Sequence, residues 1–329
     1  MTRPPSPPQH SLGSGIDVSI VIVSWNVADL LKECLRSIER WRTPGDSYQV
    51  IVVDNRSTDD TVAMVRSEFP GITLVANSEN AGFARSNNQA FSLCTGEFVL
   101  LLNPDTEVRE GAIGGMVTFL RAHPEYGAVG PKLVSTEGNV WFEGARNLPA
   151  MMDLVSEAFL LRRLFPRSKV FGRLLISYWD HASDRDVECL QGACMLVRRS
   201  VIGEIGPLDE TLFMYFEDVD FCCRIRRAGW KIRYLADAVV LHVWQGSTRQ
   251  SPEKEERMVK LTYQSYYVFF RKYKGRVYAE IARVLAVAGG LFRILLFSVA
   301  GAGRPAGRRK GFLMIDSMRP RELRRIARE

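Results

Sequence analysis

Five consecutive apolar residues, Phe98 to Leu102, run directly into Asn103-Pro104-Asp105, and this stretch constrains the fold most strongly. The apolar run is too short to span a membrane and lacks helical periodicity, so it predicts a strand buried on both faces. Pro104 has no backbone donor and ends the strand. Asp105 is therefore expected at the carboxyl end of a buried strand, where open α/β sheets bind ligands. A turn residue is the alternative for a single carboxylate at this position.

Strand and helix patterns alternate on either side of this stretch. Three strand patterns are each followed by a helix pattern, and the six ranges are 18–25, 27–38, 50–53, 60–68, 72–76 and 80–94. Asn26 can cap the first helix. This alternation predicts a mainly parallel, doubly wound α/β sheet with right-handed crossovers.

The second half of the chain is less regular. A helix pattern from 110 to 122 is followed by strand patterns at 128–134, 187–198, 231–235 and 239–243, a helix at 216–228 and a charged connector at 249–260. Gly229 is well placed to end the helix before it. We expect a disordered tail at 1–16, a globular domain at 17–248 with halves at 17–107 and 108–248, and a helical basic region at 249–329.

Several functional classes are disfavoured by missing motifs. No GxGxxG loop follows the first strand and the chain has no GxxxxGK[ST], so NAD and ATP sites of the usual kinds are not expected. The six cysteines form no CxxC pair, which favours reduced core thiols over disulfides or zinc. The first seventeen residues lack a cationic start and an apolar run, so a cytoplasmic location is predicted.

Charge is distributed unevenly. Residues 271–329 contain fifteen Lys/Arg and four Asp/Glu, a surplus of +11, which leaves residues 1–270 at −4 within the total of +7. Such a basic end predicts a polyanionic partner. No nucleic-acid recognition module is present, so an anionic membrane surface is preferred to nucleic acid.

The range 277–302 is apolar for most of its length but contains Arg283 and Arg293. A membrane-spanning helix would bury Arg293 at a cost of about 3 kcal/mol. A helix lying in the membrane interface avoids that cost and places the following basic residues beside the lipid headgroups. Packing of this helix on the catalytic body, with a solvated basic end, is the alternative.

Five segments in the order VSIVIVSWN, VVDNRSTDDT, NSENAGFARSNNQA, GEFVLLLNPDTEV and MYFEDVDFCCRIRRAGW resemble the inverting family 2 glycosyltransferases. Within that family they resemble the bacterial rhamnosyltransferase-like branch, over about residues 17–245. The resemblance implies a GT-A fold, with a Rossmann-like sheet, a small additional antiparallel part and a C-terminal helical extension. It further implies transfer of L-rhamnose from dTDP-L-rhamnose to a lipid-linked or polysaccharide acceptor in cell-envelope biosynthesis, by an enzyme peripheral to the inner face of the membrane.

A nucleotide-sugar donor has a diphosphate leaving group, for which a hard divalent cation, Mn²⁺ or Mg²⁺, is suited. Asn103-Pro104-Asp105 takes the place of the family's DxD motif, with an amide in place of the first carboxylate. The resemblance implies that Asp105 and His242 are metal ligands and that Asn103 contacts the donor nucleotide. A lone strand histidine such as His242 is otherwise a core residue.

The resemblance also implies a set of donor-binding residues. Asp54 would accept the N3–H of uracil or thymine, although an Asx turn explains the same residue locally. The other residues implied in nucleotide binding are Ser24, Asn26, Asn80, Gly82, Phe83 and Asn87. A plain helix cap is the alternative for Asn80. The donor sugar or acceptor would contact Gln191, Gly192 and Ala193.

Inverting transfer needs a base for the acceptor hydroxyl. Glu217-Asp218 matches the family's acidic pair, which implies that Asp218 is the base and that Glu217 supports it. Carboxylates in the first turn of a helix also stabilise it by about 0.3–1 kcal/mol without any catalytic role. Two other functions remain open at this point: a UDP-hexose or UDP-galactofuranose transferase of the same fold, and a catalytically silent sugar-nucleotide-binding scaffold.

Overall fold

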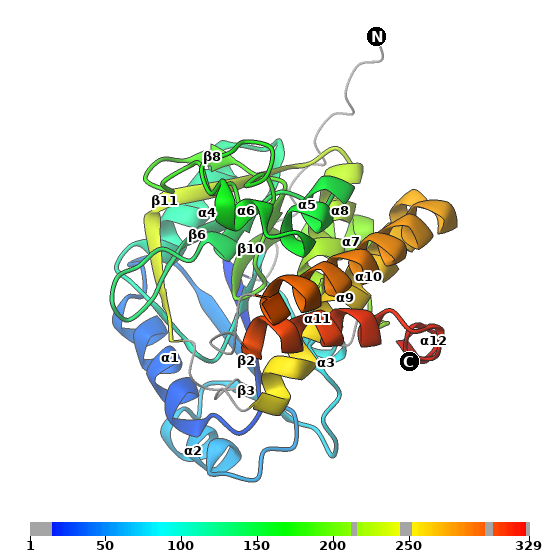
Figure 1. The fold of residues 1–329 in the computed structure, drawn as a ribbon. Helices are drawn as coiled ribbons and strands as arrows, with labels where there is room; N and C mark the ends of the chain where they lie inside the picture. Colours follow the sequence, from blue (N-terminus) through cyan, green and yellow to red (C-terminus); the bar gives the residue numbers. More distant parts are fainter. Residues whose placement is uncertain (1–14, 212–215, 244–251, 300–304, 327–329) are drawn as a thin grey trace.

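The computed structural model describes residues 15–211, 216–243, 252–299 and 305–326. A nine-stranded sheet forms its centre, in the order β3-β2-β1-β4-β10-β6-β11-β5, with β8 paired to β11 (Figure 1). The first four strands are parallel neighbours, and they are β1 (Val18–Ser24), β2 (Tyr48–Asp54), β3 (Thr73–Ala76) and β4 (Phe98–Leu102). All five residues of β4 are buried, as the apolar run predicts.

Helices cover both faces of this parallel half. They are α1 (Ala28–Arg40), α2 (Thr61–Glu68), α3 (Phe83–Phe91) and α4 (Ala112–Ala122). Ile20 and Ile22 pack in one apolar cluster with α1 and α4, whereas the intervening Val21 packs on the opposite face with Ala90 of α3. This alternation along β1 is what a doubly wound sheet requires. The predicted α/β fold class is confirmed.

The start of α1 differs from the prediction. Asn26 does not cap the helix, because its side-chain oxygen accepts a hydrogen bond from Thr58 N–H at 2.7 Å and Val27 occupies the cap position. Asp59 caps the helix from a different loop by accepting a hydrogen bond from Ala28 N–H at 3.1 Å. The loops after β1 and β2 are thus joined to each other.

The second half of the sheet mixes strand directions. Its strands are β5 (Thr106–Val108), β6 (Tyr126–Val134), β8 (Arg185–Asp186), β10 (Cys194–Arg198) and β11 (Lys231–His242). Strands β6 and β11 run with the first four, while β5, β8 and β10 run against them. β7 (Ala145–Arg146) and β9 (Cys189–Leu190) form the expected small antiparallel sheet.

Two strand predictions need correction. The range 187–198 is not one strand, because the turn at 191–193 separates β9 from β10. The ranges 231–235 and 239–243 are parts of the single strand β11, whose register against β6 shifts between Leu235 and Val239. A β-bulge of this kind bends a strand without ending it.

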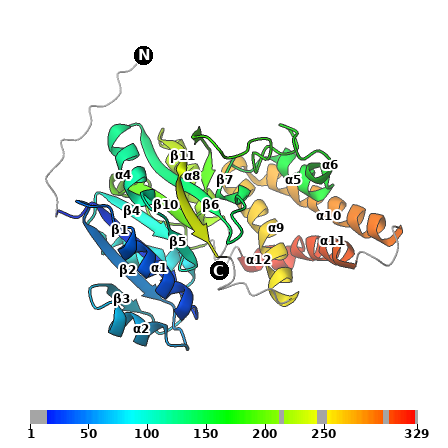
Figure 2. The same ribbon diagram turned by 90° about the vertical axis from the view of Figure 1, so that its left-hand side faces the viewer.

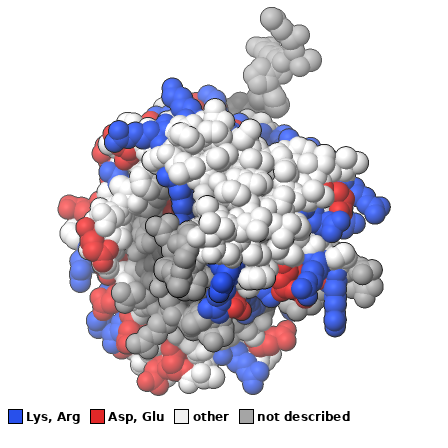
Figure 3. Space-filling view, viewed as in Figure 1, with Lys and Arg blue, Asp and Glu red and all other residues white. Residues whose placement is uncertain are grey.

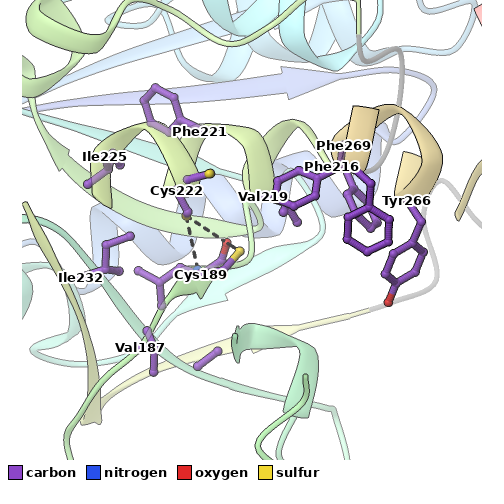
Figure 4. Packing of buried hydrophobic residues seen from close by; sticks show 14 of the residues in the cluster. Val187, Cys189, Phe216, Val219, Phe221, Cys222, Ile225, Ile232, Tyr266 and Phe269 are labelled. Carbon is purple, nitrogen blue, oxygen red and sulfur yellow. Dashed lines mark hydrogen bonds between the residues drawn. The ribbon is translucent and has the colours of Figure 1, made fainter. Parts of the chain in front are cut away.

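Short helices surround this half: η1 (Phe142–Gly144), α5 (Met151–Ala158), α6 (Leu161–Leu164), α7 (Arg199–Ile205) and α8 (Glu217–Arg227). α8 ends just before Gly229, which has a φ of 93° as predicted for a terminating glycine. Residues 213–215, which precede it in sequence, lie outside the described residues. Figure 4 shows Phe216 and Val219 pointing toward Tyr266 and Phe269.

Four helices follow the sheet: α9 (Pro252–Lys274), α10 (Arg276–Val299), α11 (Pro305–Ser317) and α12 (Pro320–Ile326). They lie on the side of the molecule away from α1 and α2 (Figure 2). The predicted connector at 249–260 is wrong in part, since helix α9 already begins at Pro252. Tyr266 and Phe270 belong to the same apolar core as α8, so α9 packs on the part of the protein that contains the sheet.

Helix α10 is long and apolar enough to cross a membrane, by length and composition alone. One of its sides is buried and consists mainly of alanine and glycine. Arg293 on that side is only 1% exposed, and its guanidinium donates to the carbonyls of Glu157 and Ala158 at the end of α5. These bonds satisfy a buried cation at a helix carboxyl terminus, which favours positive charge. This side of α10 therefore packs on the body.

Candidate active site

Two residues predicted as metal ligands come together where β5 meets β11. The strands pair antiparallel, with Thr106 opposite His242, and Val243 N–H donates to the Asp105 carbonyl at 2.8 Å. As a result His242 Nε2 lies 3.4 Å from Asp105 Oδ1. Both side chains are more than nine-tenths buried. Backbone pairing, rather than any local motif, brings these groups together.

The donor set fits a divalent cation. A carboxylate and an imidazole suit Mn²⁺, and two protein ligands leave coordination positions for phosphate oxygens and water. Within the ranges that the structure describes, no group of three or more His, Cys, Asp or Glu side chains could hold a metal ion. A cation bound at Asp105 and His242 would thus depend on its other ligands.

Asn103 links the end of β4 to the loop at 191–193. Its backbone N–H donates to the Ala193 carbonyl at 2.9 Å, and its own carbonyl accepts from the Thr106 hydroxyl at 2.7 Å. The side chain stays half-buried at the end of the strand. The Asn-Pro-Asp loop and the predicted sugar-binding loop are therefore neighbours.

Ser24 and Asp54 end adjacent parallel strands and face each other in register. Asp54 Oδ2 accepts from Ser57 N–H at 2.9 Å, a local contact that reaches three residues on and not the two of an Asx turn. The other oxygen, Oδ1, and the Ser24 hydroxyl are buried without a hydrogen-bond partner in the described part of the chain. Leaving such groups unpaired costs about 1–3 kcal/mol each, which a bound ligand would recover.

The Asn80-to-Asn87 loop and helix lie next to this edge. Asn80 accepts from Gly82 N–H at 3.0 Å, so it shapes the loop, and Gly82 has a φ of 79°. Asn87 is buried and donates to the Phe83 carbonyl at 2.8 Å. Helix α3 starts at Phe83, later than the sequence predicts. The amides of Asn80 and Asn87 thus have internal partners.

Asn55 organises the same region and was not singled out in the sequence. Its side chain donates to the Gly82 carbonyl at 3.3 Å and accepts from the Ser86 hydroxyl at 2.6 Å and from Asn77 at 3.0 Å. One buried amide therefore holds the segment 77–86 against the end of β2. The one sequence feature that could have indicated a role for Asn55 is its position directly after Asp54.

The acidic pair lies in the first turn of α8. Asp218 is 7% exposed and accepts from Gly192 N–H at 3.2 Å and Val219 N–H at 2.7 Å. A Cβ placed on Gly192 would lie 3.6 Å from both the Phe83 ring and Asp218 Cβ. The structure thus brings together Phe83, Gly192 and Asp218, which are far apart in sequence.

Arg146 completes this arrangement and was missed by sequence reasoning. Its Nη2 lies 3.0 and 2.9 Å from the two carboxylate oxygens of Asp218. Burial opposes its positive charge, but its neighbours, first Asp218 and then Cys189 and Cys222, together outweigh burial and raise the pKa of Arg146 above its usual value. Arg146 lies in the two-residue strand β7, inside a region that carries no motif, so the sequence offered no signal.

Glu217 differs sharply from its neighbour. Burial, together with the adjacent Asp218 charge, raises the pKa of Glu217 to about 8. Its Oε2 is buried and, among the described residues, has no hydrogen-bond partner. Near neutral pH Glu217 is therefore mostly protonated, while Asp218 forms an ion pair with Arg146.

Known proteins match this chain in sequence and in fold. The family model described as "Glycosyltransferase like family 2" matches residues 15–262. An N-acetylglucosaminyl-diphospho-decaprenol L-rhamnosyltransferase of Mycobacterium tuberculosis is 31% identical over 218 residues, covering 62% of this chain and 69% of the relative. Rhamnosyltransferase WbbL of Escherichia coli (strain K12) is 23% identical, covering 68% of this chain and 83% of the relative.

A solved structure shows the same fold. The mannosyltransferase PcManGT from Pyrobaculum calidifontis, in complex with GDP-Man and Mn²⁺, superimposes with a TM-score of 0.57 at 17% identity. The match covers 91% of this chain and 85% of that one. Fold and sequence agree on the class, which is that of the GT-A glycosyltransferases. More narrowly, the chain belongs to glycosyltransferase family 2, in the branch that contains the rhamnosyltransferases.

Proposed function

We propose that this glycosyltransferase moves L-rhamnose from dTDP-L-rhamnose to a lipid-linked glycan acceptor. The observation that carries the proposal is the meeting of Asp105 and His242, 3.4 Å apart, next to the loop at 191–193 that also bonds Asp218. The name of the Mycobacterium tuberculosis relative supports both the sugar and a polyprenyl-diphosphate acceptor. That acceptor chemistry supports a place for the enzyme at the inner face of the cell membrane.

The nucleoside would bind at the ends of β1 and β2. Asp54 Oδ1 is a buried acceptor without a partner among the described residues, and thymine or uracil offers an N3–H donor of the required kind. The unpaired Ser24 hydroxyl can bond the same nucleoside. Asn26, Asn80, Gly82, Phe83 and Asn87 would shape the walls of this site, and Asn103 would contact the ribose.

Asp105 and His242 would hold Mn²⁺ or Mg²⁺. When bound there, the cation neutralises the charge that develops on the diphosphate leaving group. The manganese in the PcManGT complex supports this choice of cofactor. Gln191, Gly192 and Ala193 would lie against the donor sugar, because Gly192 leaves space between the Phe83 ring and Asp218.

Asp218 would take the proton from the acceptor hydroxyl as that oxygen attacks the anomeric carbon from the side opposite the diphosphate. Arg146 and Gly192 N–H hold the carboxylate in a fixed orientation, which a general base needs. Glu217, protonated near neutral pH, can donate a hydrogen bond to the acceptor or to a neighbouring oxygen. The assignment is Asp218 as base and Glu217 as support.

A donor panel tests the proposal. Purified full-length protein with Mn²⁺ or Mg²⁺ would receive dTDP-L-rhamnose, UDP-hexoses, UDP-galactofuranose and GDP-mannose, together with a polyprenyl-diphosphate-linked N-acetylglucosamine. We expect rhamnosyl transfer from dTDP-L-rhamnose to exceed every other rate. Preference for a UDP-sugar would replace the donor assignment, and failure with the entire panel would favour a silent sugar-nucleotide-binding scaffold.

Asp218→Asn separates binding from turnover. The variant should bind dTDP as the wild type does, because Asp218 lies at α8 rather than at the ends of β1 and β2, yet it should lose turnover. Asp29→Asn, an exposed carboxylate on α1, is the matched control. Substantial transfer by Asp218→Asn would reject Asp218 as the base.

A further inference from the structure

Helix α10 presents an apolar stripe on the side that faces away from the body. The stripe consists of exposed residues at helical spacing, and these are Val277, Ile281, Val284, Leu291, Leu295 and Val299. Val277 is 76% exposed and Leu295 is 67% exposed. Since successive members are three, four or seven residues apart, they lie on one side of the helix and form a strip. The buried Ala, Gly and Arg293 side of the same helix faces the protein.

A second segment, distant in sequence, extends this surface. Leu164, Phe165 and Val170 are 68%, 52% and 53% exposed in α6 and the turn after it. Phe159, just before α6, packs on Phe292 of α10 with ring centroids 5.4 Å apart. We call the α10 stripe and these three residues the apolar face. Figure 3 shows a broad surface free of charged side chains over α10 and α6, bordered by Lys and Arg together with a few Asp and Glu.

The border of the apolar face is positively charged. Residues 160–175 contain five Lys/Arg and no Asp/Glu, and Arg163, Arg167 and Lys169 are exposed. Arg308 of the neighbouring helix α11 is exposed as well. Glu157 pairs with Arg162, Arg293 and Lys310, and Glu280 of α10, which is partly exposed, pairs with Arg283. The unpaired charge beside α6 and the turn after it is therefore mainly basic.

We propose that the apolar face docks on an anionic lipid surface, with its apolar side chains among the acyl chains and the basic border among the headgroups. Apolar area bounded by Lys and Arg is the composition that binds such surfaces in the interfacial plane. A second copy of the chain fits less well, because its basic border would meet the same charge. The inference rests on the proposed function, which places the acceptor in a membrane, and adds the face that binds there.

Vesicle sedimentation with the purified full chain tests this docking. The wild type should bind vesicles of phosphatidylcholine with phosphatidylglycerol and bind pure phosphatidylcholine much less. Leu295→Glu and Val284→Glu should each weaken binding at least tenfold, and Arg163→Glu and Lys169→Glu by about fivefold or more, as expected for a basic residue near an anionic surface. All four side chains are exposed, so each variant should keep the wild-type melting temperature while it binds vesicles more weakly.

Matched controls lie elsewhere on the molecule. Leu93→Glu changes an exposed leucine after α3, and Arg66→Glu reverses an exposed charge on α2, and neither should alter vesicle binding. Equal binding by wild type and all variants, or no wild-type binding, would overturn the proposal. A wild-type dimer that Leu295→Glu converts to monomer would also overturn it, in favour of a second copy. Donor hydrolysis without vesicles reports on the proposed function separately, and the four variants should retain it.

Discussion

Arg146→Met removes the cation that pairs with Asp218 and leaves a carboxylate that is mostly buried. The side chains of Arg146 and Asp218 are 19% and 9% exposed, and loss of one partner from a buried pair costs about 3–5 kcal/mol. Because Gly192 and Val219 N–H still bond Asp218, we expect the lower end, about 3 kcal/mol. Urea unfolding followed by circular dichroism measures the change in free energy.

Turnover provides the second readout for Arg146→Met. A base displaced by about 1 Å loses roughly 100-fold in rate, so turnover should fall by that order while dTDP affinity stays unchanged. The double variant Arg146→Met/Asp218→Asn should recover part of the lost stability, because the unpaired charge is gone. Arg85→Met, at a solvent-exposed pair with Glu79, is the control and should cost less than about 1 kcal/mol.

These two readouts can refute the reasoning about Arg146. Arg146→Met could lose no more stability than Arg85→Met and retain wild-type turnover. Arg146 would then neither pair with Asp218 in solution nor position it. A stability loss without any change in turnover would leave Arg146 as a structural residue only.

Four further outcomes are expected. The pKa of Glu217 is raised to about 8 in the folded state from its usual 4.5, so the free energy of unfolding of the wild type should fall as the pH rises from about 5 to 8. The fall should be roughly 3 kcal/mol larger than in Glu217→Gln. Parallel pH profiles of the two proteins in urea unfolding would contradict this. His242→Ala should raise the Mn²⁺ concentration for half-maximal turnover by about tenfold or more, and an unchanged metal titration would remove His242 from the ligand set. Asp54→Asn should weaken dTDP binding by about tenfold in calorimetry, since an amide donor replaces the acceptor, and unaltered affinity would exclude contact with N3–H. Gly289→Ala should destabilise the fold, because its Cβ would lie 2.4 Å from Ala158 Cβ, whereas Gly203→Ala has open space and should not; equal effects on the thermal melt would argue against the packing of α10 on α5.

The strand Phe98–Leu102 follows directly from hydrophobic patterning, since all five of its residues are buried, and the alternation of the first half follows from the same patterning. The proximity of Asp105 and His242 has a different origin. It depends on the pairing of β5 with β11, which no local pattern encodes, and it was anticipated only through the family resemblance. Neither hydrophobic patterning nor the family resemblance could predict the role of Arg146, because a two-residue strand has no periodicity and its region carries no motif.

The start of α9 could have been predicted from the sequence, but the high charge of the segment favoured a connector. Pro252 is followed by acidic residues in the sequence, which is a common pattern for the first turn of a helix. The buried face of the helix lies further along, at Tyr266 and Phe270, and this tertiary packing decides its structure.

Asp220 has a consequence for how this enzyme can be divided. It is fully buried one turn into α8 and accepts hydrogen bonds from Arg224 of its own helix and from Lys272 and Tyr273 of α9. The helix that carries Glu217 and Asp218 is therefore anchored by the part of the chain that follows the sheet. A chimera that exchanges the C-terminal helices between family members must therefore retain Lys272 and Tyr273. Without them, the buried Asp220 carboxylate would lose two of its hydrogen-bond donors.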